Sequence, residues 1–382
     1  MMICIAWTLA GSLQAVLAQV QADFRENADA RGGITLSGAD QSGTASASVA
    51  RTDPADNANI DDVRTKETIN MLFLGNSFTF RHDLPSLVKT VFEEGQPNLT
   101  VHAASLTYGG KSMFHHHKLY HSETRIREGS ITTAEIDAAI MDIQYLNLRA
   151  DPPAFYTEYN DVPGMAPVEW DNPKKFLPRA EARQNNLLNA INAGQRTQWD
   201  YVVLQSWRDV VEDSEEGYGR YAEILADIAG QEGINVILYI TAPYAQNATP
   251  VHAPLDPQET ILQMQTVQEL VDRIHPYAVV PVALGIEKLQ AGGSGLTFRY
   301  VNDFHPNQTC AFLTANMFYA AFFGESTEGF SWNTVTETKD TDGTDPDGGD
   351  PTVVFDEPTK LLLQRTAYDA VMAFRTLYTK LM

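Results

Sequence analysis

One segment of the chain carries a serine where an α/β protein could use it as a nucleophile. The apolar stretch 69–74 leads directly into Gly75, Asn76 and Ser77, and a predicted helix follows after a short loop. The carboxyl ends of the strands in an α/β sheet are where such folds place their ligands. A serine hydroxyl there can attack a carbonyl carbon if a nearby base removes its proton. Gly-Asn-Ser is also a common turn, so the triplet alone does not establish a nucleophile.

A histidine that could serve as the base lies far along the chain. His305 stands in a loop just before an apolar helical stretch, and Asn302 and Asp303 precede it. An imidazole can remove the serine proton when one ring nitrogen faces the hydroxyl and an acceptor holds the other nitrogen. A surface histidine beside an acidic residue by chance would look the same in the sequence. Either neighbour could orient the ring.

Two further strand ends supply groups that could stabilise a negatively charged oxygen. Gly109 and Gly110 follow the predicted strand 99–105, and glycine lets a backbone N–H approach a ligand closely. Gln205 ends the predicted strand 201–205. Its side-chain amide could donate a hydrogen bond to an oxyanion or cap the next segment.

The elements that must position these groups follow an alternating pattern. Short runs that are apolar on both faces alternate with longer helical segments, which is typical of a parallel sheet covered on both sides. The predicted strands cover 69–74, 99–105, 201–205, 236–240 and 278–282. The predicted helices cover 84–94, 180–193, 218–231, 258–274, 310–323 and 360–381. The pattern predicts a single doubly wound α/β domain with a five-stranded parallel, flavodoxin-like sheet and helices on both faces.

Taken in chain order, the four blocks resemble those of the SGNH hydrolases, the GDSL-type serine esterases and lipases. The resemblance covers roughly residues 68–330, with Gly-Asn-Ser-Phe-Thr in the first block and His-Pro-Asn in the last. It implies that Ser77 is the nucleophile and that His305 is its general base. It also implies that the Ser77 N–H, the Gly110 N–H and the Gln205 side chain hold the oxyanion.

The chain departs from the pattern of this family at two positions. The third block normally supplies an asparagine, and Gln205 is one methylene longer. The orienting aspartate normally lies three residues before the histidine, where this chain has Asn302. We expect Asp303 to orient His305 through a shifted loop register, with Asn302 as the alternative. An aspartate would also stabilise the imidazolium, which an asparagine cannot do.

The resemblance further implies a reaction and a substrate class. We expect hydrolysis of carboxylic esters, above all acetyl esters, through an acyl-enzyme on Ser77 and without a cofactor. Esters of carbohydrates are the candidate substrates. Asn76, Trp207 and His116 are the predicted substrate-binding residues. Further aromatic residues in the segment 145–178 could stack on sugar rings, and these are Tyr156, Tyr159 and Trp170. The alternatives are an inactive carbohydrate-binding protein of the same fold and an acyltransferase.

A cluster of histidines invites a metal interpretation. His115, His116 and His117 are consecutive, and His121 would share a helix face with His117. No carboxylate or cysteine stands nearby at ligand spacing, so we expect no metal and assign the cluster to helix packing or to the lining of the site.

Charge and cysteine content exclude other classes of protein. The 382 residues contain 27 Lys and Arg and 49 Asp and Glu, so 27 − 49 = −22. A chain this acidic repels phosphate backbones, and we expect no nucleic-acid partner. Two cysteines exclude a disulfide scaffold.

The ends and insertions of the chain complete the predicted organisation. We expect a signal peptide at 1–22 and hence a secreted or periplasmic protein with no stable membrane span after cleavage. A disordered leader is predicted at 23–67 and the hydrolase domain at 68–382, with insertions near 145–178 and 337–351. The second insertion is acidic and is predicted to be a flexible, solvated loop. Calcium binding is the alternative, but no Glu or Asp stands at the twelfth position of an EF-hand loop.

Overall fold

A computed structural model describes most of the predicted hydrolase domain. The described residues are 66–107, 109, 112–113, 116, 199–207, 210, 217–242, 255–303, 305–339 and 343–379. The predicted signal peptide, the leader up to residue 65, the insertion near 145–178 and the predicted helix 180–193 lie outside this part of the chain.

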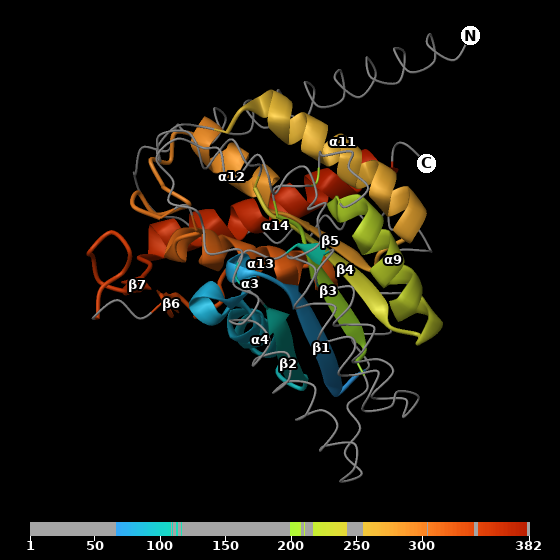
Figure 1. Ribbon diagram of the computed structural model, residues 1–382. Helices are drawn as coiled ribbons and strands as arrows, with labels where there is room; N and C mark the ends of the chain where they lie inside the picture. The colour runs from blue at the N-terminus through green and yellow to red at the C-terminus, as the bar shows by residue number, and fades with distance from the viewer. Residues whose placement is uncertain are drawn as a thin grey trace, which may run out of the picture.

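The centre of the fold is a five-stranded parallel sheet (Figure 1). Its strands are β1 (Thr68–Gly75), β2 (Thr100–Thr107), β3 (Tyr201–Gln205), β4 (Asn235–Ile240) and β5 (Ala278–Pro281). They lie in the order β2-β1-β3-β4-β5, and all four pairings are parallel. This is the flavodoxin-like order of a doubly wound sheet, so the predicted fold class is confirmed. Because β1 lies between β2 and β3, the residues after β1 emerge beside the ends of both neighbours.

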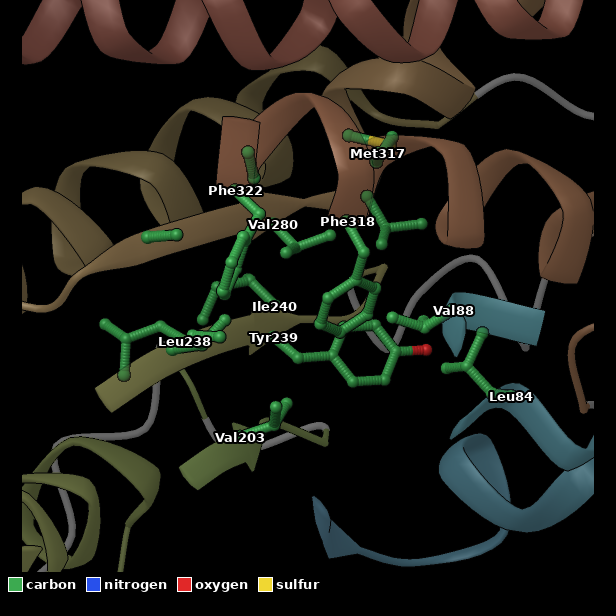
Figure 2. Packing of buried hydrophobic residues seen from close by; sticks show 14 of the residues in the cluster. Leu84, Val88, Val203, Leu238, Tyr239, Ile240, Val280, Met317, Phe318 and Phe322 are labelled. Carbon is green, nitrogen blue, oxygen red and sulfur yellow. The ribbon is translucent and has the colours of Figure 1, made fainter. Parts of the chain in front are cut away.

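Helices cover the sheet and build the core. They are α4 (Leu84–Gly95), α9 (Tyr218–Gln231), α11 (Pro257–Ile274), α12 (Val282–Ala291), α13 (Gln308–Phe323) and α14 (Glu357–Thr379). Every residue of α13 except Thr309 is buried. The ring of Phe318 lies 5.8 Å from that of Phe73 and 5.4 Å from that of Tyr239, which fixes α13 against β1 and β4. Figure 2 shows the rings of Phe318 and Tyr239 next to each other.

The start of α13 is set by a cap that lies close to His305. Asn307 precedes the helix, and its Oδ1 accepts a hydrogen bond from the Cys310 N–H at 3.1 Å. Its amide nitrogen donates to the carbonyl of Thr297 at 3.0 Å. The loop that carries His305 therefore ends at a well-anchored helix terminus.

A small antiparallel hairpin occupies the region of the predicted acidic insertion. It consists of β6 (Thr334–Thr336) and β7 (Thr352–Val354). In the described part of the connection, Asp345 Oδ1 accepts from the N–H groups of Asp347 and Gly349 at 2.9 and 2.7 Å. The strands flank the predicted insertion at 337–351, and carboxylates of its described part accept hydrogen bonds from backbone groups. No helix of the described residues is long and apolar enough to cross a lipid bilayer.

Candidate active site

The serine and the histidine that the sequence singled out meet at the end of β1. The Asn76 side chain caps the short helix α3 (Ser77–Phe80) by accepting from the Phe78 N–H at 3.1 Å, which makes Ser77 the first helical residue. Ser77 Oγ lies 2.7 Å from His305 Nε2. The hydroxyl thus faces the ring nitrogen that would remove its proton.

The second ring nitrogen of His305 is held by Asp303. Asp303 Oδ1 contacts Nδ1 of the ring and also accepts from the His305 backbone N–H at 3.2 Å. The side chain of Asn302 is exposed, and its backbone N–H donates to Asp347 Oδ1 at 2.8 Å. Of the two candidate orienting residues, the structure brings Asp303 to the histidine, whereas Asn302 is exposed.

Two cations contact the other oxygen of Asp303. Oδ2 accepts from Arg81 Nη1 at 3.0 Å and from Lys339 Nζ at 3.1 Å. Burial alone would raise the pKa of Asp303, but the hydrogen bonds and charges of His305, Arg81 and Lys339 outweigh it and hold that pKa well below its usual range. Asp303 is therefore a carboxylate throughout the neutral range, as the partner of an imidazolium must be.

Arg81 is itself bound by a second carboxylate. Its Nε donates to Glu337 Oε1 at 2.8 Å, and its Nη2 donates to Glu337 Oε2 at 2.5 Å. Arg81 lies in η1 (Arg81–Asp83), which follows α3, and Glu337 directly follows β6. Burial would raise the pKa of Glu337, but the paired guanidinium lowers it to about 2. Both members of this pair are buried and charged.

His82 lies beside the same carboxylate. Its Nε2 donates to the carbonyl of Pro306 at 2.9 Å and lies 3.6 Å from Glu337 Oε2. Burial lowers the pKa of His82 despite the neighbouring carboxylate, so the ring is neutral at neutral pH. His82 therefore ties the chain after α3 to the residue that follows His305.

Gln205 is placed differently from its predicted role. Its Nε2 donates to Asn76 Oδ1 and to the Ser206 carbonyl, both at 2.9 Å. Its Oε1 accepts from the Asn76 N–H at 2.9 Å and from Thr79 Oγ1 at 2.6 Å. Both amide hydrogens are thus committed, and neither is left for an oxyanion. The longer side chain reaches across to the start of α3 and supports it from β3.

The remaining predicted oxyanion donors are described only in part. Ser77 is the first residue of α3, so its backbone N–H has no acceptor within the helix. Gly110 lies outside the described residues, whereas its neighbour Gly109 is described and partly exposed.

The predicted substrate-binding residues are largely buried. Asn76 Oδ1 is used by the cap and by Gln205, and His116 is completely buried. Trp207 is 6% exposed, which leaves little ring surface for a stacked sugar. Tyr156, Tyr159 and Trp170 lie outside the described part of the chain.

A metal centre is not formed by the residues that the structure describes. Among them, no group of three or more His, Cys, Asp and Glu side chains is arranged to hold an ion. His115, His117 and His121 lie outside the described ranges.

Comparison with known proteins finds likeness in the solved structures only. No family model and no curated protein matches the sequence. A protein of Slackia heliotrinireducens described provisionally as an SGNH hydrolase is 14% identical, with a TM-score of 0.32 over 65% of this chain and 95% of its own. A DUF4886 family protein from Bacteroides uniformis is 11% identical, with a TM-score of 0.41 over 80% and 95% of the two chains. A gut microbial diltiazem-metabolizing enzyme is 13% identical, with a TM-score of 0.34 over 68% and 48%.

Likeness at this level concerns the fold and transfers no activity. The chain has an α/β fold built on a five-stranded parallel sheet. It resembles the SGNH hydrolases in the position of Ser77 after the first strand and of His305 shortly before α13.

Proposed function

We propose that the protein is a serine hydrolase that cleaves carboxylic esters through an acyl-enzyme on Ser77. The observation that carries this proposal is the continuous chain of contacts from Ser77 Oγ to His305 Nε2, and from His305 Nδ1 to Asp303 Oδ1. A hydroxyl, a base and a carboxylate in that order are the working parts of a Ser-His-Asp triad.

The reaction follows from the positions of these atoms. His305 Nε2 takes the proton of Ser77 as Oγ bonds to the ester carbonyl carbon, and Asp303 stabilises the imidazolium. The carbonyl oxygen becomes an oxyanion, for which we propose the backbone N–H groups of Ser77 and Gly110 as donors. His305 then gives its proton to the departing alcohol. Water attacks the acyl-enzyme in the second half-reaction, with His305 again acting as the base.

Gln205 has a supporting part in this proposal. Its amide fixes Asn76, the residue before the nucleophile, through the backbone N–H and through Oδ1. We therefore assign Gln205 to the placement of the Ser77 N–H and not to direct contact with the oxyanion.

The finer assignments rest on the resemblance. We propose acetyl esters as the preferred substrates, with a carbohydrate alcohol as the leaving group, and an exported protein. One reason to consider an inactive carbohydrate-binding protein was the missing carboxylate at position 302. The contact between Asp303 and His305 supports the active alternative, because Asp303 supplies a carboxylate to the ring.

A fluorophosphonate probe tests the proposed class directly. We expect it to label the folded protein on the peptide that contains Ser77, as mapped by mass spectrometry. Ser77→Ala should abolish labelling and lower the turnover of p-nitrophenyl acetate by at least about a thousandfold. The exposed Ser86, in α4, supplies the matched control, and Ser86→Ala should behave as the wild type. Clean labelling of another serine, or a Ser77→Ala variant within a few-fold of wild type, would overturn the proposal.

A further inference from the structure

We propose that Glu337, acting through Arg81, is a positioning residue that keeps the catalytic carboxylate of Asp303 turned toward His305. This inference rests on the proposed function, because it concerns Asp303 as the partner of the general base. It assigns a role in catalysis to a hairpin residue that is remote from Ser77 in the sequence.

The two oxygens of Asp303 have separate partners. Oδ1 contacts His305 through both the ring Nδ1 and the backbone N–H. Oδ2 contacts Arg81 Nη1 and Lys339 Nζ. The carboxylate can orient the imidazole only while one of its oxygens, here Oδ1, stays available to His305.

The hydrogen-bonding geometry of a guanidinium group favours a different use of the Asp303 oxygens. Arginine prefers to bind a carboxylate with two parallel N–H groups, one to each oxygen. A buried Arg81 with Asp303 as its sole anionic partner would take both Asp303 oxygens in this way. His305 would then lose Oδ1, or share it with a charged competitor.

Glu337, and not Asp303, is the carboxylate that Arg81 binds with two N–H groups. It occupies Nε and Nη2, so that Arg81 presents Nη1 to Asp303. The plane of the guanidinium is fixed further by the ring of Tyr300, whose centroid lies 5.4 Å from Arg81 Cζ. Glu337 therefore determines which edge of Arg81 meets the catalytic carboxylate.

Charge balance favours the same assignment. Arg81 and Lys339 supply two positive charges, and Asp303 and Glu337 supply two negative charges. The side chain of Glu337 is wholly buried, where an unpaired charge is costly. Removal of its charge leaves Asp303 as the one carboxylate of this cluster shared by both cations.

A double-mutant cycle separates positioning from general structural support. Glu337→Gln should lower kcat for p-nitrophenyl acetate by at least about tenfold and change KM by less than about threefold. In an Asp303→Asn background, the same substitution should lower kcat by less than about twofold, because the group through which it acts is already lost. Equal losses in both backgrounds, or a wild-type kcat for Glu337→Gln, would overturn the inference.

Two further variants control for folding and for charge. Glu337→Asp keeps the buried ion pair but shortens its reach, and it replaces Glu337→Gln if that variant does not fold. We expect Glu337→Asp to lower kcat less than Glu337→Gln does, and to lower it only when Asp303 is present. An equal fall in kcat in the Asp303→Asn background would count against positioning. Glu328 forms an ion pair with Arg365, with 2.6 Å between Oε1 and Nη2, and neither residue belongs to the candidate site. Glu328→Gln is therefore the matched control and should keep the wild-type kcat.

Failure of this inference differs from failure of the proposed function. Fluorophosphonate labelling of Ser77 together with an additive cycle would reject only the role of Glu337. Absence of labelling at Ser77 would reject both.

Discussion

Asp303 and Asn302 are neighbours in the sequence, yet their side chains have unlike surroundings. The two-residue spacing from Asp303 to His305 lets one carboxylate oxygen accept from the His305 backbone N–H and also contact the ring. An aspartate that bonds to the N–H two residues onward forms a compact local turn. Asn302 instead lies at the exposed end of this loop, where Asp347 binds its backbone N–H. The register shift is thus a local property of the loop.

Substitution at the two positions should give opposite results. Asp303→Asn should lower kcat by about a thousandfold or more, because the ring loses the charge and the acceptor that fix its tautomer. Asn302→Ala should retain nearly full kcat, since the backbone N–H used by Asp347 is unchanged. Both values come from initial rates on one acetyl ester. Equal effects at the two positions would argue against the Asp303 assignment.

Some residues of the candidate site could be predicted from the sequence and others could not. Ser77 and His305 could be singled out as candidates because each stands beside a strongly apolar element that fixes its place in the fold. The hydrogen bonds of Gln205 to Asn76 and Thr79 could not be predicted, because those residues are more than 120 positions away. Arg81 and Glu337 were missed for the same reason, since 256 positions separate them and neither has a local partner that signals a role.

At the level of elements, the junction between β1 and α3 holds Ser77, the proposed nucleophile. Gly75 ends β1, and the side chains of Gln205 and Thr79 fold over its backbone. A Cβ added at Gly75 would lie 2.3 Å from Gln205 Oε1 and 2.4 Å from Thr79 Oγ1. The absence of a side chain here lets β3 support the start of α3.

Gly75→Ala should therefore damage both stability and catalysis. The added methyl group must displace the Gln205 amide, and the buried groups that it satisfies would lose their partners at roughly 1–3 kcal/mol each. We expect a lower Tm in thermal unfolding, together with a fall in kcat. Gly230→Ala is the control, because a Cβ there meets no atom within 4 Å. A Gly75→Ala variant with the Tm of the control would contradict the packing described above.

The sequence was a better guide to long elements than to short ones. The apolar runs predicted all five strands of the sheet, because strands buried on both faces leave an uninterrupted signal. The hairpin β6–β7 has three residues in each strand, too few for a period to be read. Helix α12 was not predicted because it follows β5 without a connecting loop.

For the molecule as a whole, the buried ion cluster links folding to pH. The folded pKa of Glu337 is about 2, below its ordinary value of 4.5, so the unfolded chain binds a proton here at a higher pH than the native protein. Its contribution to stability is fully present above pH 4.5 and is lost as the pH falls toward 2. Asp303, whose pKa is also depressed, acts in the same direction.

Denaturant unfolding between pH 6 and about pH 2.5 tests this linkage. Glu337→Gln should be less stable than wild type at pH 6, and the difference should shrink by up to about 3 kcal/mol as the pH falls. The free energy of unfolding at each pH gives the measurement, and Glu328→Gln again supplies the control. Parallel curves for wild type and Glu337→Gln would show that the Glu337 pKa is not depressed by folding.

The 256 positions between Arg81 and Glu337 also set an order of events during protein synthesis. A chain growing on the ribosome presents Ser77 first, then Asp303 and His305, and only later the hairpin with Glu337 and Lys339. On the proposed mechanism, an unfinished chain contains a nucleophile and a base whose carboxylate is not yet held in place.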